Sequence, residues 1–276
     1  MSQFDTNNNW RRMFINTMKN GTEIEVRGSR IKEIEGQALT VDPMWPFITF
    51  EARNYNMDYC KKELQWKVQA DKYDDRIENH ATMWASVKNK DGSFNSNYGD
   101  YWFADGGVER AVEQLLKDKH SRRACIPMLK AEHTELDVND TVCTEAMTFL
   151  IRGDRLNCHV HMRSSDQVFG LGTDIPSFSF VMRLVLGFIQ AKYPEVQMGK
   201  LTIVAASSHI YDHHYDLFDK LDQQKPPVKP MSNDFWMPLC GFDEARYLCT
   251  RRYSGIIMSH EAAWPLTQWL ISGGRL

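Results

Sequence analysis

The chain has 276 residues, of which 42% are hydrophobic and 12% aromatic, so it can bury a sizeable core in one large domain covering residues 1–276. Lys and Arg number 33 and Asp and Glu 36, which gives a net charge of -3. This balance excludes a surface built to bind polymeric nucleic acid or anionic lipid, and it predicts that any anionic ligand is small and locally bound.

The sequence indicates neither a secretion signal nor a membrane anchor. Residues 1–14 lack the apolar core of a signal peptide, and no other stretch approaches the roughly 20 apolar residues of a membrane span. We therefore expect a soluble, cytoplasmic protein with no membrane partner. The cysteines are Cys60, Cys125, Cys143, Cys158, Cys240 and Cys249. They form neither a CxxC pair nor a close cluster with histidine, which predicts reduced thiols, no disulfide framework and no metal site.

Two adjacent segments in the first half of the chain carry clear local signals. Residues 91–100 (DGSFNSNYGD) are rich in turn formers, which predicts a loop. Residues 107–118 place Val108, Val112 and Leu115 at helical spacing, which predicts a helix with one apolar face.

The segments that follow favour a hairpin and a buried helix. Residues 147–162 alternate apolar and polar side chains around the turn Arg152-Gly153-Asp154, as in a β-hairpin. Residues 177–192 are apolar on nearly every side and Pro176 suits a first helical turn, so we expect this helix in the middle of the protein. Residues 223–230 (QQKPPVKP) form a second loop. Because helices and strands do not alternate regularly, we predict an α+β fold with helices packed on a large sheet.

The neighbours of Cys143 make this thiol the candidate for chemistry. Taken alone, it is most simply a buried thiol at the start of a strand. Arg163 follows 20 positions later and Arg122-Arg123 lie upstream, so several guanidinium groups could converge on an anion that Cys143 also touches. The rigid fork of an arginine pairs with two phosphate oxygens. For each arginine by itself, a solvated surface charge is the alternative.

Residues 143–178 (CTEAMTFLIRGDRLNCHVHMRSSDQVFGLGTDIPSF) combine a cysteine, a predicted hairpin, an Arg-Ser-x-Asp sequence and a glycine-containing turn into the buried helix. Around them, in order, stand NGTEIEVRG, KKELQW, MWASV, SNYG, HSRR and SSHIYDHH. These ordered motifs, spread from about residue 10 to residue 220, resemble the thymidylate synthase and deoxycytidylate hydroxymethylase family. SNYG, MRSSDQVFG and CTEAMTFLIR are closer to the phage hydroxymethylases, and Thr144 stands where a synthase typically has histidine.

The resemblance implies a nucleotide site. Its catalytic residues would be Cys143 as the nucleophile, with Glu63, Tyr98 and Asp166. Its nucleotide-binding residues would be Arg27, Arg163 and Ser164 at the 5′-phosphate, Arg122 and Arg123 from the partner subunit, Ser165, Asp174 at the base, and His209 and Tyr211 at the sugar 3′-hydroxyl. For His209 and Tyr211, ordinary core or surface polarity is the alternative.

The resemblance also implies a co-substrate and an assembly. The co-substrate would be 5,10-methylenetetrahydrofolate, contacted by Glu63, Trp84, Asp166 and Gly170, and no metal is implied. The fold would be thymidylate synthase-like, with a large mixed sheet whose face forms a homodimer.

Asp174 is the position that indicates the base. Thymidylate synthases carry asparagine here, whose amide can both donate to and accept from uracil. An ionised aspartate only accepts, which suits the exocyclic amino group of cytosine and repels the uracil carbonyl, and a protonated carboxyl could serve N3 of cytosine. The alternative is that Asp174 caps the helix that follows.

The implied chemistry is covalent catalysis. Addition of the Cys143 thiolate to C6 of the pyrimidine turns C5 into an enamine-like nucleophile, and nearby arginines would lower the pKa of the thiol. Glu63 would organise water and relay protons. Its alternative role is a structural salt bridge with Lys61, Lys62 or Lys67.

Two outcomes of this chemistry differ in the last partner of the one-carbon unit. Hydride from the folate gives a methyl group, whereas water gives a hydroxymethyl group. The chain ends in WLISGGRL, which departs from the Pro-Val-Ala-like tail that excludes water in synthases, so we favour hydroxymethylation of dCMP. The alternatives are a methyltransferase on dCMP, a hydroxymethylase or synthase-type enzyme on dUMP, and a non-catalytic nucleotide-binding protein.

Overall fold

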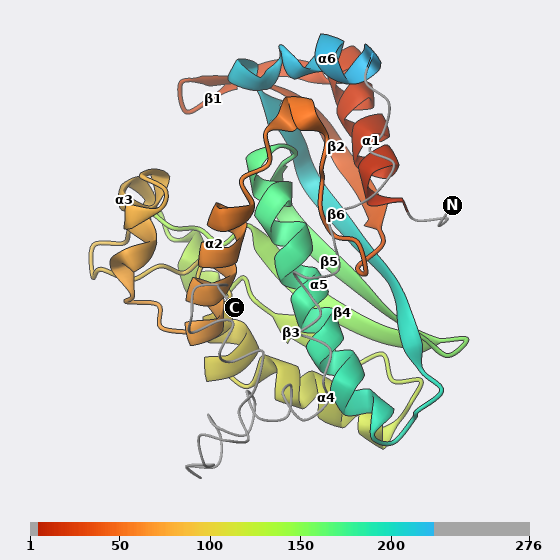
Figure 1. The fold of residues 1–276 in the computed structure, drawn as a ribbon. Coiled ribbons are helices and arrows are strands. Elements are labelled where there is room, and N and C mark those ends of the chain that lie inside the picture. The colour runs from red at the N-terminus through yellow and green to blue at the C-terminus, as the bar shows by residue number, and fades with distance from the viewer. Residues whose placement is uncertain (1–4, 224–276) are drawn as a thin grey trace.

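Six strands form one mixed sheet, and the long helix α5 packs against its centre (Figure 1). The structure is a computed structural model that describes residues 5–223. Its helices are α1 (Thr6–Asn20), α2 (Met57–Gln69), α3 (Met83–Val87), α4 (Gly107–Lys117), α5 (Phe169–Gln190) and α6 (Leu217–Gln223). Its strands are β1 (Thr22–Val26), β2 (Ser29–Val41), β3 (Cys125–Pro127), β4 (Thr144–Arg152), β5 (Arg155–Asp166) and β6 (Gln197–Tyr211). The α+β prediction is confirmed.

The strand order is β1-β2-β6-β5-β4-β3, and only the β5–β6 pair is parallel. Two hairpins close with two-residue turns, Arg27-Gly28 between β1 and β2 and Gly153-Asp154 between β4 and β5. All four turn residues have positive φ, as in type I′ turns, whose twist matches that of the flanking strands. The predicted hairpin over 147–162 is confirmed, although its strands are longer than the alternation indicated.

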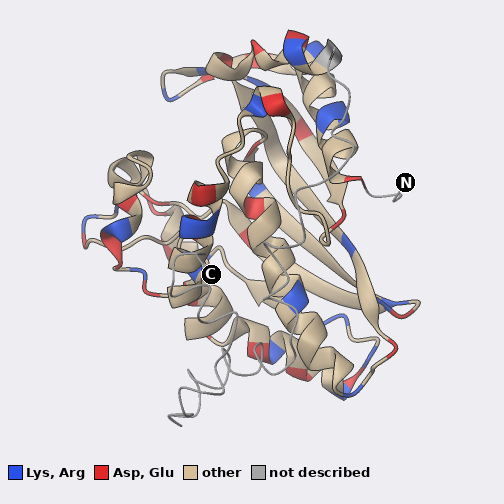
Figure 2. Ribbon diagram, viewed as in Figure 1, with Lys and Arg blue, Asp and Glu red and all other residues tan. Residues whose placement is uncertain are grey.

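Alternation along the central strands separates a buried face of the sheet from a partly exposed one. Phe149 on β4, Val160 on β5 and Ile203 on β6 are buried under the helices. The residues between them, such as His159 and Thr202, stay partly exposed on the opposite face. Figure 2 shows the same division along the chain, since most of the sheet and of α5 is uncharged while Lys, Arg, Asp and Glu gather on the peripheral segments.

Helix α5 begins at Phe169, eight positions before the predicted start, and Pro176 lies inside it rather than in its first turn. Proline has no N–H for the carbonyl four residues earlier, so Gly172 loses its helical partner. The Tyr55 hydroxyl donates to that carbonyl oxygen at 2.8 Å. A side chain outside the helix thus replaces the missing bond, a compensation that the local sequence does not reveal.

Helix α5 is also, within residues 5–223, the one helix long and apolar enough to cross a membrane by length and composition. Its most apolar 18-residue window is 78% buried inside the protein, which marks it as a core helix. The expectation that no segment approaches a membrane span in composition is corrected by this helix, whereas its predicted central position is confirmed.

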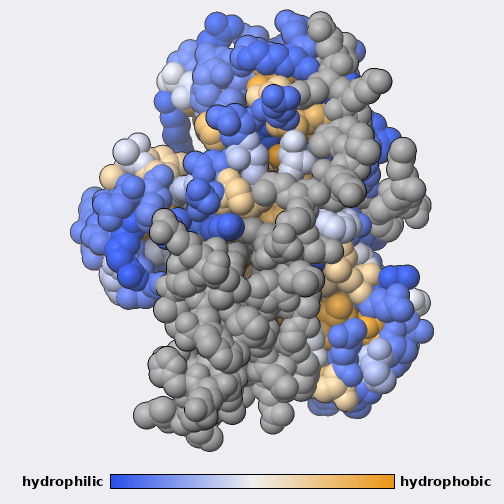
Figure 3. Space-filling model, in the orientation of Figure 1, coloured by the Kyte–Doolittle hydropathy of each residue, from blue (hydrophilic) through white to orange (hydrophobic). Residues whose placement is uncertain are grey.

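Residues 91–100 form a loop, as predicted, but the loop is anchored. Phe94 is fully buried and packs edge-on against Trp66 and Trp84 in a small aromatic cluster apart from the main core. The predicted helix at 107–118 is α4, which ends at Lys117. On the face drawn in Figure 3, the surface over β1, α6 and the α3 region is mostly hydrophilic. Most of the predicted loop at 223–230, Cys240, Cys249 and the chain end lie outside the described residues.

Candidate active site

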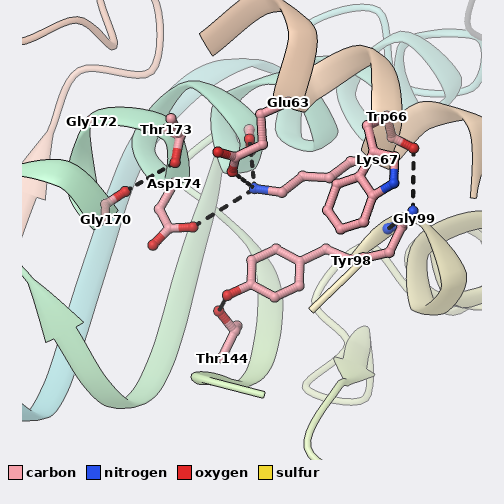
Figure 4. A network of polar contacts seen from close by, with 12 residues as sticks. Glu63, Trp66, Lys67, Tyr98, Gly99, Thr144, Gly170, Gly172, Thr173 and Asp174 are labelled. Atoms are coloured by element: carbon pink, nitrogen blue, oxygen red, sulfur yellow. Dashed lines mark hydrogen bonds and ion pairs between the residues drawn. The ribbon is translucent and has the colours of Figure 1, made fainter. Parts of the chain in front are cut away.

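Two helices bring three charged side chains together in the interior (Figure 4). Glu63 and Lys67 lie one turn apart on α2, with the Lys67 Nζ 2.6 Å from the Glu63 Oε1, and Asp174 of α5 places its Oδ1 3.9 Å from the same nitrogen. We call Glu63, Lys67 and Asp174 the carboxylate cluster. Their exposed fractions are 5%, 2% and 8%. The salt bridge offered as the alternative role of Glu63 is thus present, and it lies within the site rather than on the surface.

The cluster changes the acidity of Asp174. Burial raises its pKa to about 7, the Lys67 ammonium opposes the rise, and Glu63 and Asp166 add to it. A carboxyl group in this range can be protonated or ionised near neutral pH, which is a property typical of functional sites.

Tyr98 closes the cluster from the loop before α4. The Lys67 Nζ lies 4.6 Å from the centre of the Tyr98 ring, and the Tyr98 hydroxyl accepts a hydrogen bond from Thr144 at 3.0 Å. The next residue, Gly99, touches the backbone of α2, because a Cβ there would overlap the Lys67 carbonyl oxygen. The glycine of the SNYG motif therefore allows Tyr98 to approach α2.

Cys143 immediately precedes β4 and is half-buried, with its Sγ 3.6 Å from the Arg163 Nη2. Arg163 also donates to the carbonyl oxygens of Val142 at 3.0 Å and Thr141 at 2.5 Å, and its backbone N–H donates to that of Cys143. One guanidinium therefore fixes the backbone around the thiol and faces its sulfur. The 20-residue spacing is explained by the β4–β5 hairpin, which returns the chain to its starting point.

The pKa of Cys143 departs from the predicted direction. Burial raises it, Arg163 lowers it, and the carboxylates of Asp174 and Asp140 raise it further, so the net shift is upward. Arg27 also lowers it. The arginines act as predicted, but removing the thiolate from water outweighs them.

A clip that the sequence reasoning missed holds the Tyr98 loop against the segment before Cys143. The carboxylate of Asp140 accepts from the Ser96 hydroxyl at 2.5 Å and from the Ser96 backbone N–H at 2.7 Å. Asn95 donates to the Asp140 carbonyl oxygen at 2.9 Å. Because Asp140 is three positions before Cys143 and Ser96 two before Tyr98, these hydrogen bonds fix the Tyr98 loop relative to Cys143.

The predicted phosphate and sugar residues come from the strands next to Cys143. Arg27 occupies the tip of the β1–β2 hairpin, and it influences both Cys143 and Tyr211 electrostatically. Ser164, Ser165 and Asp166 of β5 pair in register with Ser207, Ser208 and His209 of β6. His209 is buried and its ring lies edge-on to that of Tyr211 at 5.1 Å. The parallel β5–β6 pair therefore brings the two predicted groups side by side.

Asp166, the last residue of β5, caps the start of helix α5. Its carboxylate accepts from the backbone N–H groups of Val168 at 2.9 Å, Phe169 at 3.1 Å and Gly170 at 3.3 Å. Carboxylates satisfy free N–H groups at helix starts in this way. Asp174 lies inside the helix, so the alternative in which it caps the helix is wrong, and Asp166 has that role. A Cβ on Gly170 would lie 3.8 Å from the Asp174 Oδ2, which places Gly170 beside the cluster.

Trp84 lies behind Glu63 rather than in the open. Its indole N–H donates to the Tyr59 hydroxyl at 2.9 Å, and that hydroxyl lies within hydrogen-bond reach of Glu63. Trp84 is buried and stacks at a tilt on Trp66. Its contact with a folate stays a prediction, and the structure adds a link from Trp84 through Tyr59 to Glu63.

Comparison with known proteins shows the family of this chain. Residues 8–233 match the family described as thymidylate synthase. The deoxycytidylate 5-hydroxymethyltransferase of Enterobacteria phage T6 is 28% identical over 206 residues, which are 71% of this chain and 82% of the relative. The enzyme of the same name from Enterobacteria phage T4 is 27% identical over the same extent.

The chain belongs to the thymidylate synthase family. Thymidylate synthase-like proteins use methylenetetrahydrofolate as co-substrate, so the chain is a folate-dependent one-carbon transferase, as its motifs predicted. Within residues 5–223, no group of three His, Cys, Asp or Glu side chains could hold a metal ion.

Arg122 and Arg123 are exposed in this thymidylate synthase fold. They follow α4, and within residues 5–223 neither guanidinium makes an ion pair. They are not gathered with the residues around Cys143, and their supply to a partner's site stays a prediction.

Two buried residues of this family member carry polar links that the motifs did not single out. The Gln167 Nε2 lies 2.8 Å from the Thr17 Oγ1, 3.0 Å from the Gln37 Oε1 and 2.9 Å from the Ser208 Oγ, and its two N–H groups donate within this set. It therefore ties the strand end at Asp166 to α1, β2 and β6. Lys67 was named only as a possible partner of Glu63. Its helical spacing from Glu63 was the available signal, and the approach of α5 was not readable from the sequence.

Proposed function

We propose that the chain transfers a one-carbon unit from 5,10-methylenetetrahydrofolate to C5 of dCMP through a covalent bond between Cys143 and C6, and that water completes the reaction to give 5-hydroxymethyl-dCMP and tetrahydrofolate. The observation that carries the proposal is the buried carboxyl group of Asp174 on α5, which acts electrostatically on the Cys143 thiol. The names of the phage T6 and T4 relatives support the same substrate and product.

Asp174 supports cytosine as the base. A buried carboxyl with a pKa of about 7 can accept from the exocyclic amino group and, when protonated, donate to N3. An ionised carboxylate would face the O4 carbonyl of uracil with like partial charge, which disfavours dUMP.

Cys143 and Arg163 support the covalent step. Because burial raises the pKa of the Cys143 thiol, the thiol has to lose its proton as the sulfur adds to C6. The Arg163 guanidinium at 3.6 Å favours the thiolate and fixes the neighbouring carbonyl groups. In this role Arg163 would face both the sulfur and, with Arg27 and Ser164, the 5′-phosphate.

Glu63 is proposed to organise water and to relay protons. Its carboxylate is held on one side by Lys67 and lies within reach of the Tyr59 hydroxyl on the other. Tyr98, whose hydroxyl is fixed by Thr144, lies across Lys67 from it. Glu63 is therefore a hydrogen-bond acceptor in a fixed position, and a water molecule could bridge its carboxylate and the base.

The start of α5 supports the folate site. The Phe169 ring is 63% exposed and lies 4.5 Å from the His214 ring, next to Gly170. An exposed aromatic ring beside a glycine offers a flat apolar surface to a planar ligand. When bound, the folate would supply the one-carbon unit, with Asp166, Gly170, Glu63 and Trp84 as its proposed contacts.

A homodimer is typical of the family, and we propose one for this chain through the sheet face opposite α5. That face carries partly exposed side chains, both polar and apolar, among them Thr148, Leu150, His159 and Val204. In such a dimer, Arg122 and Arg123 would reach the phosphate in the partner's site, which explains why they stand apart from the site in their own chain.

We propose that residues 1–276 act as a single catalytic domain in the cytoplasm, that of the host if the chain is phage-encoded, with no membrane or polymeric nucleic acid as partner. The net charge of -3 supports small anionic ligands over a nucleic-acid surface.

Product mass tests the proposed function. The purified chain is incubated with methylenetetrahydrofolate and either dCMP or dUMP, and the mass of the nucleotide product is measured by mass spectrometry. A gain of CH2O on dCMP is the expected result. A gain of CH2 with accumulation of dihydrofolate would mean methylation, product from dUMP alone would overturn the assignment of the base, and no product from either would favour a nucleotide-binding protein.

A further inference from the structure

Lys67 is a buried cation between two residues that the proposed function gives different tasks. Its exposed fraction is 2%, and its Nζ lies 2.6 Å from Glu63, 3.9 Å from Asp174 and 3.3 Å from the Ser177 hydroxyl. The Tyr98 ring covers it at 4.6 Å. A lysine is rarely buried to this extent unless it is paired, and here it has two carboxyl groups to pair with.

The net charge of the carboxylate cluster limits how many protons its two carboxyl groups carry. With all three side chains ionised, the carboxylate cluster would hold one uncompensated negative charge out of water, which is costly. One proton on a carboxyl group makes the cluster neutral. The ammonium lies closer to Glu63 than to Asp174, so Coulomb attraction favours the ionised form of Glu63 and leaves the proton to Asp174.

We propose that Lys67 is a specificity-determining positioning residue, whose ammonium holds Glu63 as a carboxylate and directs the exchangeable proton to the Asp174 oxygen farther from it. This rests on the proposed function, which it deepens. Lys67 approaches Oδ1 of Asp174, so the proton belongs on Oδ2, the oxygen near Gly170. Asp174 then presents one fixed acceptor and one fixed donor, the complement of the amino group and N3 of cytosine.

The other titratable groups around Asp174 do not replace Lys67 in this task. Glu63 from α2 and Asp166 from β5 are acids that raise its pKa, whereas Lys67 lowers it. Tyr98 faces the cluster from the loop before α4. Burial raises the pKa of its hydroxyl, so the hydroxyl stays neutral. Cys143, immediately before β4, is also an acid, with a raised pKa. Lys67 is therefore the cation among the groups that act on Asp174.

The first measurement follows the proton itself. Infrared difference titration of the full chain detects a buried protonated carboxyl group, and its loss in Asp174→Asn assigns the signal. Lys67→Met replaces lysine by an unbranched side chain of similar length without the charge. The midpoint of the Asp174 titration is expected to rise by about one pH unit or more in this variant. Lys62→Met, on the same helix but half-exposed, is the matched control and should leave the midpoint unchanged. An unchanged midpoint in Lys67→Met would overturn the proposal.

The second measurement follows base discrimination. Calorimetry gives the affinities for dCMP and dUMP. The ratio of the dCMP affinity to the dUMP affinity should fall about tenfold in Lys67→Met and stay constant in Lys62→Met. A shifted midpoint with an unaltered ratio would overturn the role in specificity. Because the infrared titration needs no nucleotide, a wild type that fails to make product would contradict the proposed function without deciding the effect of Lys67 on Asp174.

A second pair of variants covers loss of folding, since Lys67→Met leaves two carboxyl groups buried without a cation. Glu63→Gln/Lys67→Met removes one carboxyl group together with the ammonium and is compared with Glu63→Gln. A higher Asp174 midpoint in the double variant is expected, and equal midpoints would overturn the proposal.

Discussion

The cation in contact with Cys143 comes from the hairpin that follows it, whereas the cation beside Asp174 comes from a helix more than one hundred residues earlier in the chain. Arg163 reaches the thiol because β4 and β5 pair, and it donates to two carbonyl oxygens on the way. Lys67 reaches Asp174 because α2 and α5 pack together. The first arrangement is local and partly open, and the second depends on the whole interior.

The two regions also differ in how charge is balanced. Arg163 and Arg27 lower the pKa of the Cys143 thiol, but burial and two carboxylates raise it on balance. In the carboxylate cluster, one ammonium serves two acids and a proton has to complete the balance. We therefore expect substitutions at Cys143 and Arg163 to affect the rate most, and substitutions at Asp174 to affect base choice and stability.

The largest effect is expected from Cys143→Ser. An alcohol is a far weaker nucleophile than a thiolate at neutral pH, so turnover should fall at least roughly 10^4-fold, while dCMP affinity by calorimetry changes little. Cys125→Ser, a half-buried thiol on β3, is the control and should retain turnover. Undiminished turnover in Cys143→Ser would remove this residue from the mechanism.

Arg163→Met should reduce kcat/KM roughly 100- to 1,000-fold, because it removes the cation beside the sulfur and both carbonyl contacts. The pH at which iodoacetamide alkylates Cys143 at half its maximal rate should also rise, since Arg163 lowers the pKa of that thiol. Arg155→Met on the same strand, an exposed residue, serves for comparison. If the alkylation profile does not move, Arg163 does not stabilise the thiolate.

Asp174→Asn should shift the preference for dCMP over dUMP by roughly 100-fold, since the amide can donate to O4 of uracil where the carboxylate repels it. The ratio of kcat/KM values for the two nucleotides measures the shift. Equal ratios in wild type and variant would mean that Asp174 does not read the base.

The same substitution should change stability with a defined sign. The pKa of Asp174 is raised from 3.8 to about 7 in the folded chain, so between these values the folded state binds the proton more tightly than the unfolded state. Stability from this group is full below about pH 4 and is lost as the pH rises toward 7. Asp174→Asn should therefore gain roughly 4 kcal/mol relative to wild type between pH 4 and pH 8, measured by urea unfolding. An equal difference at both pH values would contradict the raised pKa.

Ser96→Ala should have the smallest effect. It removes the 2.5 Å bond to Asp140 but keeps the backbone bond, so the loss of stability should be about 1 kcal/mol. Turnover should fall only a few-fold, because the clip relates Tyr98 to Cys143 without touching either. Urea unfolding and steady-state turnover check both, and a loss as large as that of Arg163→Met would show that the clip does more than align two loops.

The local parts of the fold could be predicted from the sequence, because alternation and helical spacing are local properties. The β4–β5 hairpin, α4 and the central helix were found in this way, and the spacing from Cys143 to Arg163 follows from the hairpin. The start of α5 was missed because Pro176 normally marks a first turn, and only the Tyr55 hydroxyl from another element makes its interior position acceptable.

Contacts between distant elements could not be predicted in the same way. The pairing of Lys67 with Asp174 and the Asp140–Ser96 clip need the packing of segments far apart in the chain. The direction of the pKa shift at Cys143 was missed for a related reason, because burial depends on the complete fold while a charged neighbour is visible in the sequence.

Strand β6 has a consequence for how the chain acquires its shape. It lies between the N-terminal hairpin and the β5-β4-β3 half of the sheet, and it is the last strand of residues 5–223. Ile31 pairs with Tyr211, and Asp166 pairs with His209, so the two halves of the sheet stay separate until β6 has been synthesised. Such long-range pairing slows folding. The β1–β2 hairpin that bears Arg27 is thus synthesised early but pairs with the rest of the sheet only when β6 is present. A nascent chain ending before residue 197 would expose the edges of both β2 and β5 to other chains.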